Sequence, residues 1–147
     1  MSLDNKFVIV PIITIVICQI IKFFLDAIEH KKFRWARIFN GTGGMPSSHT
    51  SFSSSLTMLI GLSENFKGPL FAVSLIFTLI VSYDAMGIRA ASGLQAEAIN
   101  KMADKVYKIT PKEKIEKLKE ELGHQPLEVL FGYLLGIIMA LVFYYYF

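Results

Sequence analysis

Long apolar stretches recur along the chain, separated by short polar segments. Residues 7–25 hold only Gln19 and Lys22 as strongly polar members, and neither 69–83 nor 129–147 carries a charge. Each stretch has about the length needed to cross a hydrocarbon core of roughly 30 Å. With a serine-rich apolar segment added, the pattern predicts an all-α integral membrane bundle of four spans, at about 7–25, 47–62, 69–88 and 126–146.

The serine-rich segment 47–62 differs from the other predicted spans because hydroxyls occur on more than one of its helical faces. Such a helix belongs inside a bundle, where its hydroxyls can bond to backbone or to neighbouring helices. Residues 90–122 combine an apolar stripe with many charges, which predicts a polar insert of one or two amphipathic or charged helices. We expect a single membrane domain over residues 1–147.

Composition agrees with this pattern. Hydrophobic residues make up 53% of the chain, and the mean hydropathy is +0.48. The first apolar run is longer than that of a signal peptide, and no small-residue cleavage site follows it. The single cysteine, Cys18, lies within the first predicted span, which excludes a disulfide framework and a cysteine metal cluster. We therefore expect no metal, no cofactor and no nucleic-acid partner.

Gly132 and Gly136 form a Gly-x-x-x-Gly pair in the fourth predicted span. Small residues four apart let two helices approach closely. The pair predicts either close helix packing or a homodimer.

The ionisable residues within or beside the spans gather at one end of the bundle if the spans alternate in direction. These residues are Lys22, His49, Asp84, Arg89, His124 and Glu128. The same end carries the basic loop 31–37 and the lysines between 101 and 119. The positive-inside rule then predicts a multi-pass protein of the cell membrane with this end in the cytoplasm.

A glycine-rich segment at 41–50 stands directly before the second predicted span. Pro46 suits the first turn of a helix, and Ser47 and Ser48 would place hydroxyls and free N–H groups at its positive end. His49 adds a proton donor or acceptor that works near neutral pH. The segment predicts a phosphate site with a proton-transfer histidine. The alternative is a glycine-rich loop that caps a helix, with a histidine there by chance.

Several of these motifs resemble those of a known protein superfamily. Pro46-Ser-Ser-His49 resembles the Pro-Ser-Gly-His motif of the type 2 phosphatidic acid phosphatase (PAP2) superfamily, which also includes vanadium haloperoxidases. More closely, three stretches taken in order resemble its divergent, small membrane branch: Gly43–His49, Asp84–Ala91 and Gly123–Val129. The resemblance covers nearly the whole chain.

The chain also departs from the superfamily pattern. Lys22 matches the lysine of the first motif by position, but no Arg-Pro follows it, so that arginine is either missing or replaced by Arg34 or Arg37. Residues 90–123 separate the arginine and histidine of the third motif. The acid after the histidine is glutamate rather than the commoner aspartate.

What the resemblance implies is hydrolysis of a phosphomonoester or pyrophosphate through a phosphohistidine. His124 would be the nucleophile, Glu128 would orient its imidazole, and His49 would protonate the leaving oxygen. The i, i+4 spacing of His124 and Glu128 predicts that both lie on one helical face. The implied substrate-binding residues are Lys22, Arg89, Ser47, Ser48 and Gly44, with Asp84 as an anchor for Arg89 or a nearby lysine.

The favoured interpretation is a membrane phosphatase whose substrate, a lipid phosphate or polyprenyl diphosphate, enters sideways from the bilayer. One alternative is a carrier or transporter that binds a phosphorylated molecule without hydrolysing it. Four spans are few for a transporter, so this reading requires a dimer. The other alternative is a structural membrane protein in a degenerate phosphatase fold.

Overall fold

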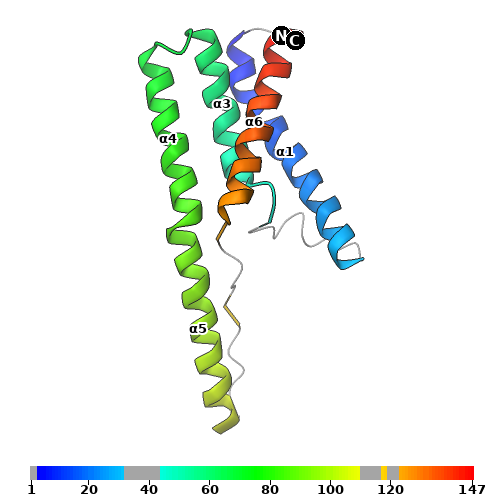
Figure 1. Ribbon diagram of the computed structural model, residues 1–147, viewed down its shortest axis with the longest axis vertical. Helices are drawn as coiled ribbons and strands as arrows, with labels where there is room; N and C mark the ends of the chain where they lie inside the picture. The colour runs from blue at the N-terminus through cyan, green and yellow to red at the C-terminus, as the bar shows by residue number, and fades with distance from the viewer. Residues whose placement is uncertain (1–2, 32–43, 110–116, 119–122) are drawn as a thin grey trace.

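The computed structural model describes residues 3–31, 44–109, 117–118 and 123–147. Within these ranges the chain is helical and contains no strand, which confirms the all-α class. The helices, shown in Figure 1, are α1 (Leu3–His30), α3 (Ser48–Ser63), α4 (Pro69–Met86), α5 (Ile88–Ile109) and α6 (Pro126–Tyr146).

Helix α3 is the centre of the bundle, because α1, α4 and α6 all pack against it. Its hydroxyls between Ser48 and Thr57 are buried, and they bond to its own turns or to a neighbouring helix. The Ser51 hydroxyl donates to the Ser47 carbonyl at 2.9 Å. The Thr57 hydroxyl donates to the Ser74 carbonyl at 3.0 Å and hydrogen-bonds with the Thr78 hydroxyl at 2.9 Å. The serine-rich helix therefore lies inside the bundle, as its composition predicted.

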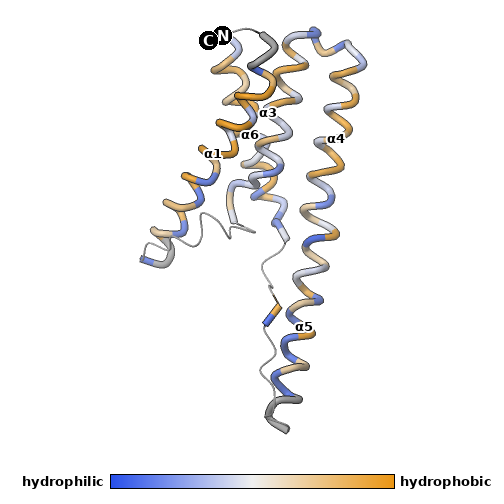
Figure 2. The backbone as a smooth tube through the Cα atoms, turned by 180° about the vertical axis from the view of Figure 1, so that it is seen from behind, coloured by the Kyte–Doolittle hydropathy of each residue, from blue (hydrophilic) through white to orange (hydrophobic). Residues whose placement is uncertain are grey.

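In the part of the chain that the structure describes, three helical stretches are long and apolar enough to cross a membrane: Lys6–Ile28, Pro69–Lys105 and Pro126–Tyr146. Figure 2 shows this apolar character along α1, α4 and α6, and a more hydrophilic α5. The outer face of α1 is a stripe at four-residue spacing, formed by Val8, Ile12, Val16 and Ile20, each about half exposed. Such a face suits contact with lipid. Helix α3 is not among these stretches, so the count of four spans stays a prediction.

Several element boundaries differ from the predicted ones. Helix α1 begins at Leu3 and runs to His30, so it extends beyond the predicted span 7–25 at both ends. No helix-breaking residue follows Leu25, and a helix can leave the membrane without ending. Pro46 was expected in the first turn of α3, but it precedes the N-cap residue Ser47.

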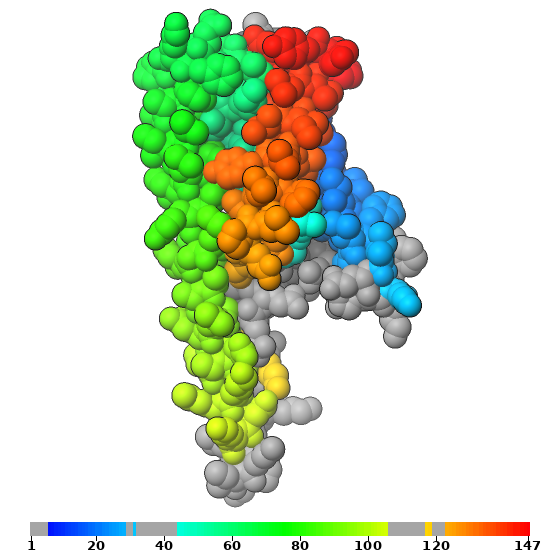
Figure 3. All heavy atoms as spheres, in the orientation of Figure 1, coloured from blue at the N-terminus to red at the C-terminus, as the bar shows by residue number. Residues whose placement is uncertain are grey.

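Helices α4 and α5 follow one another with a break only at Gly87, the C-cap of α4, so the helix in the predicted third span ends at Met86. Together they form one long rod along which α5 extends beyond the rest of the bundle (Figures 1 and 3). Beyond Ile109, the predicted polar insert lies outside the described residues except for Lys117 and Leu118, which are not helical.

The buried side chain of Asn100 binds residues 117–118 to α5. Asn100 Nδ2 donates to the Leu118 carbonyl at 2.8 Å, and the Leu118 N–H donates to Asn100 Oδ1 at 2.9 Å. Lys117 Nζ lies 3.0 Å from Asp104 Oδ2. Residues 117–118 are therefore held alongside α5 on their way back to the bundle.

The glycine pair of α6 is packed within the chain. A Cβ added at Gly132 would lie 2.8 Å from the Ser47 carbonyl oxygen, and one at Gly136 would lie 2.5 Å from that of Ser51. Both glycines are buried. Close helix packing, one of the two predicted roles, is confirmed, and its partner is α3. The homodimer through these glycines stays a prediction.

Candidate active site

The residues expected to handle phosphate meet at the end of the bundle opposite the chain termini (Figure 1). Lys22 comes from α1, His49 from the first turn of α3, Arg89 from the first turn of α5, and His124 from the segment before α6. The charges of Arg89 and Lys22 and the ring of His124 all act on the His49 imidazole. Groups far apart in sequence thus share one electrostatic environment.

His124 and Glu128 form the most closely defined pair of the site. His124 Nδ1 lies 2.7 Å from Glu128 Oε2, and the His124 side chain is only 6% exposed. An ionised carboxylate only accepts hydrogen bonds, so Nδ1 donates and Nε2 keeps a free lone pair. The contact arises differently from the predicted helical i, i+4 pairing. His124 precedes the N-cap Gln125, outside α6, and folds back over the helix start.

The first turn of α6 holds the Glu128 carboxylate in place. Glu128 Oε2 also accepts from the Gln125 backbone N–H at 3.1 Å, as part of a capping box. Pro126 occupies the start of the helix, where a missing N–H costs nothing. The carboxylate that orients His124 is therefore itself fixed by the helix cap.

The pKa of His124 lies below its ordinary value of 6.5, chiefly because burial disfavours the charged ring. The positive charges of Lys22 and Arg89 lower this pKa further, while the hydrogen bond and negative charge of Glu128 raise it. The imidazole is accordingly neutral at neutral pH, the state that a nucleophilic histidine requires.

Residues 90–123 separate Arg89 from His124 in sequence, yet the fold brings them back together. The His124 N–H donates to the Ala85 carbonyl of α4 at 3.0 Å. Gly123 lies so close to Ala90 that an added Cβ would collide with the Ala90 backbone. The insert therefore leaves and re-enters the bundle at one point, and the arginine and histidine of the third motif remain neighbours.

Asp84 and Arg89 form an ion pair across the break between α4 and α5. Arg89 Nε donates to Asp84 Oδ2 at 2.7 Å. A five-residue spacing does not align two side chains on a continuous helix, but Gly87 interrupts the helix between them. Asp84 thus lies where it holds Arg89, rather than where an anion would bind.

The start of α3 is heavily hydrogen-bonded within the protein. The Ser47 N–H donates to the Glu128 carbonyl at 2.8 Å, and the Ser47 hydroxyl caps the helix by accepting from the Thr50 N–H at 3.5 Å. The Ser48 hydroxyl lies 3.4 Å from Gln19 Nε2. Both serine hydroxyls therefore have structural partners. The N–H groups of Ser48 and His49 belong to the first turn, where no earlier helical carbonyl can accept them.

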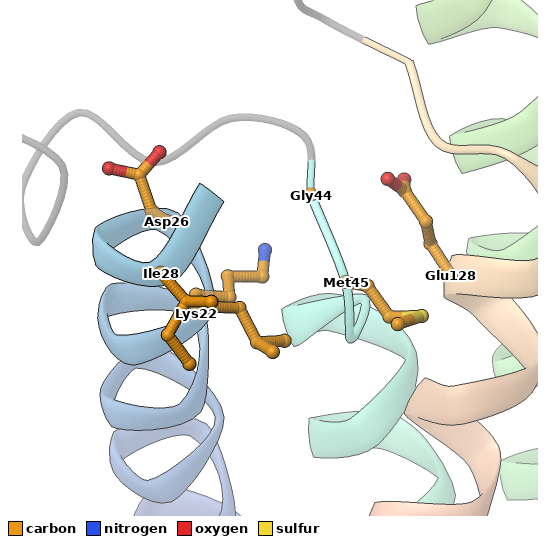
Figure 4. Close-up of a pocket in the computed structure, with 7 residues that line it drawn as sticks. Lys22, Asp26, Ile28, Gly44, Met45 and Glu128 are labelled. Atoms are coloured by element: carbon orange, nitrogen blue, oxygen red, sulfur yellow. The ribbon is translucent and has the colours of Figure 1, made fainter. Parts of the chain in front are cut away.

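A cavity of about 360 Å³ opens beside the glycine-rich segment. Its polar walls are Lys22 and Asp26 of α1, Gly44 and Glu128, and Figure 4 shows Lys22 and Glu128 reaching toward it on either side of Gly44. Gly44 has a φ of 82°, a conformation that favours glycine. Lys22 is buried, whereas a lysine that snorkels extends its ammonium group to the membrane surface.

Sequence reasoning did not single out Asp26, which is buried and lines this cavity. The signal was available, because Asp26 stands four residues after Lys22 and so shares its helical face. It was missed because α1 was expected to end at Leu25. Among the described residues, no three His, Cys, Asp or Glu side chains come together as a metal site.

These features define an all-helical membrane protein in which two histidines, one of them paired with a carboxylate, share an end of the bundle with a lysine and an arginine. The chain belongs to the divergent PAP2 family, whose model matches residues 3–139. It is 42% identical over 143 residues to the uncharacterized membrane protein YuiD of Bacillus subtilis (strain 168), with 90% of each chain covered. No solved structure matches it.

Proposed function

We propose that this protein is a membrane phosphatase that releases phosphate from a lipid phosphate or polyprenyl diphosphate through a phosphohistidine at His124. The observation that carries the proposal is the buried His124–Glu128 pair, with its 2.7 Å contact, in the field of Lys22 and Arg89. Membership of a PAP2-related family supports it.

In the first step, Nε2 of neutral His124 attacks the phosphorus, and the bond from phosphorus to the leaving oxygen breaks. Glu128 accepts the Nδ1 hydrogen bond and stabilises the positive ring that forms. His49, in its protonated form, gives its proton to the leaving oxygen. In the second step, a water attacks the phosphohistidine while His49 takes the proton of that water. The nitrogen–phosphorus bond then breaks and phosphate leaves.

Lys22 and Arg89 would bind the phosphoryl oxygens and stabilise the negative charge of the transition state. Asp84 acts through Arg89 by fixing the direction of its guanidinium. Gly44 and the first-turn N–H groups of Ser48 and His49 supply nearby backbone donors. The roles of Ser47 are the helix cap and the link to α6, rather than direct contact with phosphate.

The proposal is tested by phosphate release from purified protein in lipid nanodiscs, supplied with a prenyl diphosphate or a phosphatidic acid. We expect turnover that vanadate inhibits and a phosphoenzyme with the acid lability of a phosphohistidine. Saturable binding of the lipid phosphate without any phosphate release would contradict the proposal and favour the carrier alternative. Absence of both would favour the structural alternative.

Replacement of Glu128 with glutamine is expected to lower kcat about a hundredfold, because the imidazole loses its charged partner. Glu128 raises the pKa of His124, so its loss lowers that pKa further. Activity is lost as pH falls and His124 becomes protonated, and the acid limb of kcat/KM against pH should therefore move to lower pH. Glu97→Gln, at an exposed carboxylate of α5 paired with Lys101, is the matched control. A shift of the acid limb to higher pH would contradict the role assigned to Glu128.

Replacement of Asp84 with asparagine should lower kcat/KM about tenfold, since a charge-assisted hydrogen bond of about 1.5 kcal/mol no longer positions Arg89. Asp104→Asn removes a carboxylate that is also paired with a cation, Lys117, but on α5 far along the rod from the site. The control should keep wild-type kcat/KM in the same assay. Equal losses in the two variants would mean that Asp84 has no special role.

A further inference from the structure

A second hollow, of about 550 Å³, lies between α4 and α6. The two helices meet along the face seen in Figure 3, where α4 is green and α6 orange. The walls are almost entirely apolar: Leu79, Ile80, Tyr83 and Met86 from α4, and Val129 from α6, with Ser82 and Tyr133 as the polar members. We call this hollow the α4–α6 groove.

One end of the groove adjoins the candidate active site. Met86 follows Ala85, whose carbonyl accepts the His124 N–H. Val129 follows Glu128, which faces the polar cavity on the other side. From Met86 to Leu79 the groove spans seven helical residues, which is about 10 Å at 1.5 Å per residue. A molecule that extends past Met86 and Val129 would therefore approach the segment that carries His124.

The groove also opens to the surface that faces lipid. Ile80 and Tyr83 are 61% and 74% exposed, and both belong to a stretch long and apolar enough to cross a membrane. The groove is thus continuous with the bilayer interface along its side and with the polar end of the bundle at its tip. A hydrocarbon chain already in the membrane could enter it without crossing water.

The polar members of the groove already have partners. The hydroxyls of Ser82 and Tyr133 are hydrogen-bonded to each other at 2.9 Å, which links α4 to α6. The Ser82 hydroxyl also contacts the Thr78 carbonyl at 2.8 Å. This pair lies about one helical turn from Met86 and Val129, so the part of the groove nearest His124 is lined by apolar side chains.

We propose that the α4–α6 groove binds the first carbons of a single hydrocarbon chain joined directly to phosphate, as in a prenyl phosphate or diphosphate. This inference rests on the proposed function and narrows its substrate class. A glycerol-based phosphatidic acid carries two ester groups next to its phosphate. Their oxygens would lie against Met86 and Val129, and burial of polar groups without partners is costly. A prenyl chain has no such groups.

The test compares hydrolysis of farnesyl phosphate, a phosphatidic acid and phenyl phosphate in nanodiscs. Wild-type protein should prefer farnesyl phosphate to phosphatidic acid in kcat/KM. Ile80→Trp narrows the groove and should lower the ratio of kcat/KM for farnesyl phosphate to that for phenyl phosphate about tenfold, the scale of discrimination in hydrophobic pockets. Ile76→Trp is the matched control, because Ile76 lies one turn away on the same helix and is exposed outside the groove. It should leave the ratio unchanged.

Equilibrium binding of radiolabelled farnesyl phosphonate, which cannot be hydrolysed, separates this inference from the proposed function. Weaker binding of the phosphonate to Ile80→Trp than to Ile76→Trp would support the groove proposal. If wild-type protein then hydrolysed none of the three substrates, the phosphatase proposal alone would be overturned. Equal binding to the two variants, or a preference of wild-type protein for phosphatidic acid, overturns the groove proposal.

Discussion

Replacement of His124 with alanine is expected to abolish phosphate release, by a factor of about 10⁴ or more, as when a covalent nucleophile is removed from other hydrolases. The neutral, buried imidazole is the group whose Nε2 is free to attack, because Glu128 accepts the bond from Nδ1. The measurement is release of phosphate from a prenyl diphosphate, together with trapping of the phosphoenzyme. The variant should form no phosphoenzyme.

His49→Ala provides the comparison that separates nucleophile from general acid. With an alkyl or prenyl leaving group, loss of the proton donor should slow the first step about 10²- to 10⁴-fold. With 4-nitrophenyl phosphate the leaving oxygen needs no proton, so His49→Ala should recover the rate of the first step, seen as a burst of 4-nitrophenol, while His124→Ala should not. Phosphate release by His49→Ala should stay slow, because the second step still lacks the base that takes the proton of water. Recovery in His124→Ala, or phosphoenzyme formation without this histidine, would show that the nucleophile is elsewhere. Circular dichroism checks that both variants are folded.

Gly136→Ala is expected to lower the free energy of unfolding by about 2 kcal/mol or more, because the added methyl group would clash with α3. An added Cβ would be 2.5 Å from the Ser51 carbonyl oxygen and 2.9 Å from the Ser55 nitrogen, and it would also collide with the Ser54 hydroxyl. Backbone atoms cannot rotate away as side chains can, so α3 and α6 must separate. Thermal unfolding in detergent, followed by circular dichroism, measures the loss.

Gly87→Ala is the matched glycine-to-alanine control. Gly87 has a φ of −99°, which any residue can adopt, and an added Cβ would be 3.1 Å from the Tyr83 carbonyl oxygen. This change should cost much less than Gly136→Ala. If Gly136→Ala left thermal stability unchanged but altered the oligomeric mass in detergent, the glycine face would serve a homodimer instead of contact with α3.

The apolar pattern predicted the helices well because membrane helices satisfy their own backbone and need only length and hydrophobicity. The elements at 48–63, 69–86 and 126–146 begin and end within a few residues of their predicted bounds. The end of α1 was predicted too early, at Leu25, because Asp26, Glu29 and His30 are polar yet remain helical. Polarity marks where a helix leaves the lipid, and a separate signal is needed to mark where it ends.

Contacts between elements were harder to predict. The i, i+4 spacing of His124 and Glu128 suggested one helical face, but a cap outside the helix makes the contact. The five-residue spacing of Asp84 and Arg89 does not align them on one continuous helix, but the break at Gly87 lets them pair. Local periodicity describes a regular helix, whereas both pairs form where a helix begins or breaks.

The sequence by itself determined the helices, their lipid-facing character and the end of the bundle at which the ionisable residues gather, because these follow from hydrophobicity and alternating direction. Only the tertiary structure decided that the insert returns to its starting point, where the His124 N–H bonds to Ala85, and that the α6 glycines serve α3. It also decided that a groove lies between α4 and α6. These are contacts between residues distant in the chain, and their free energy depends on shape complementarity that no local pattern contains.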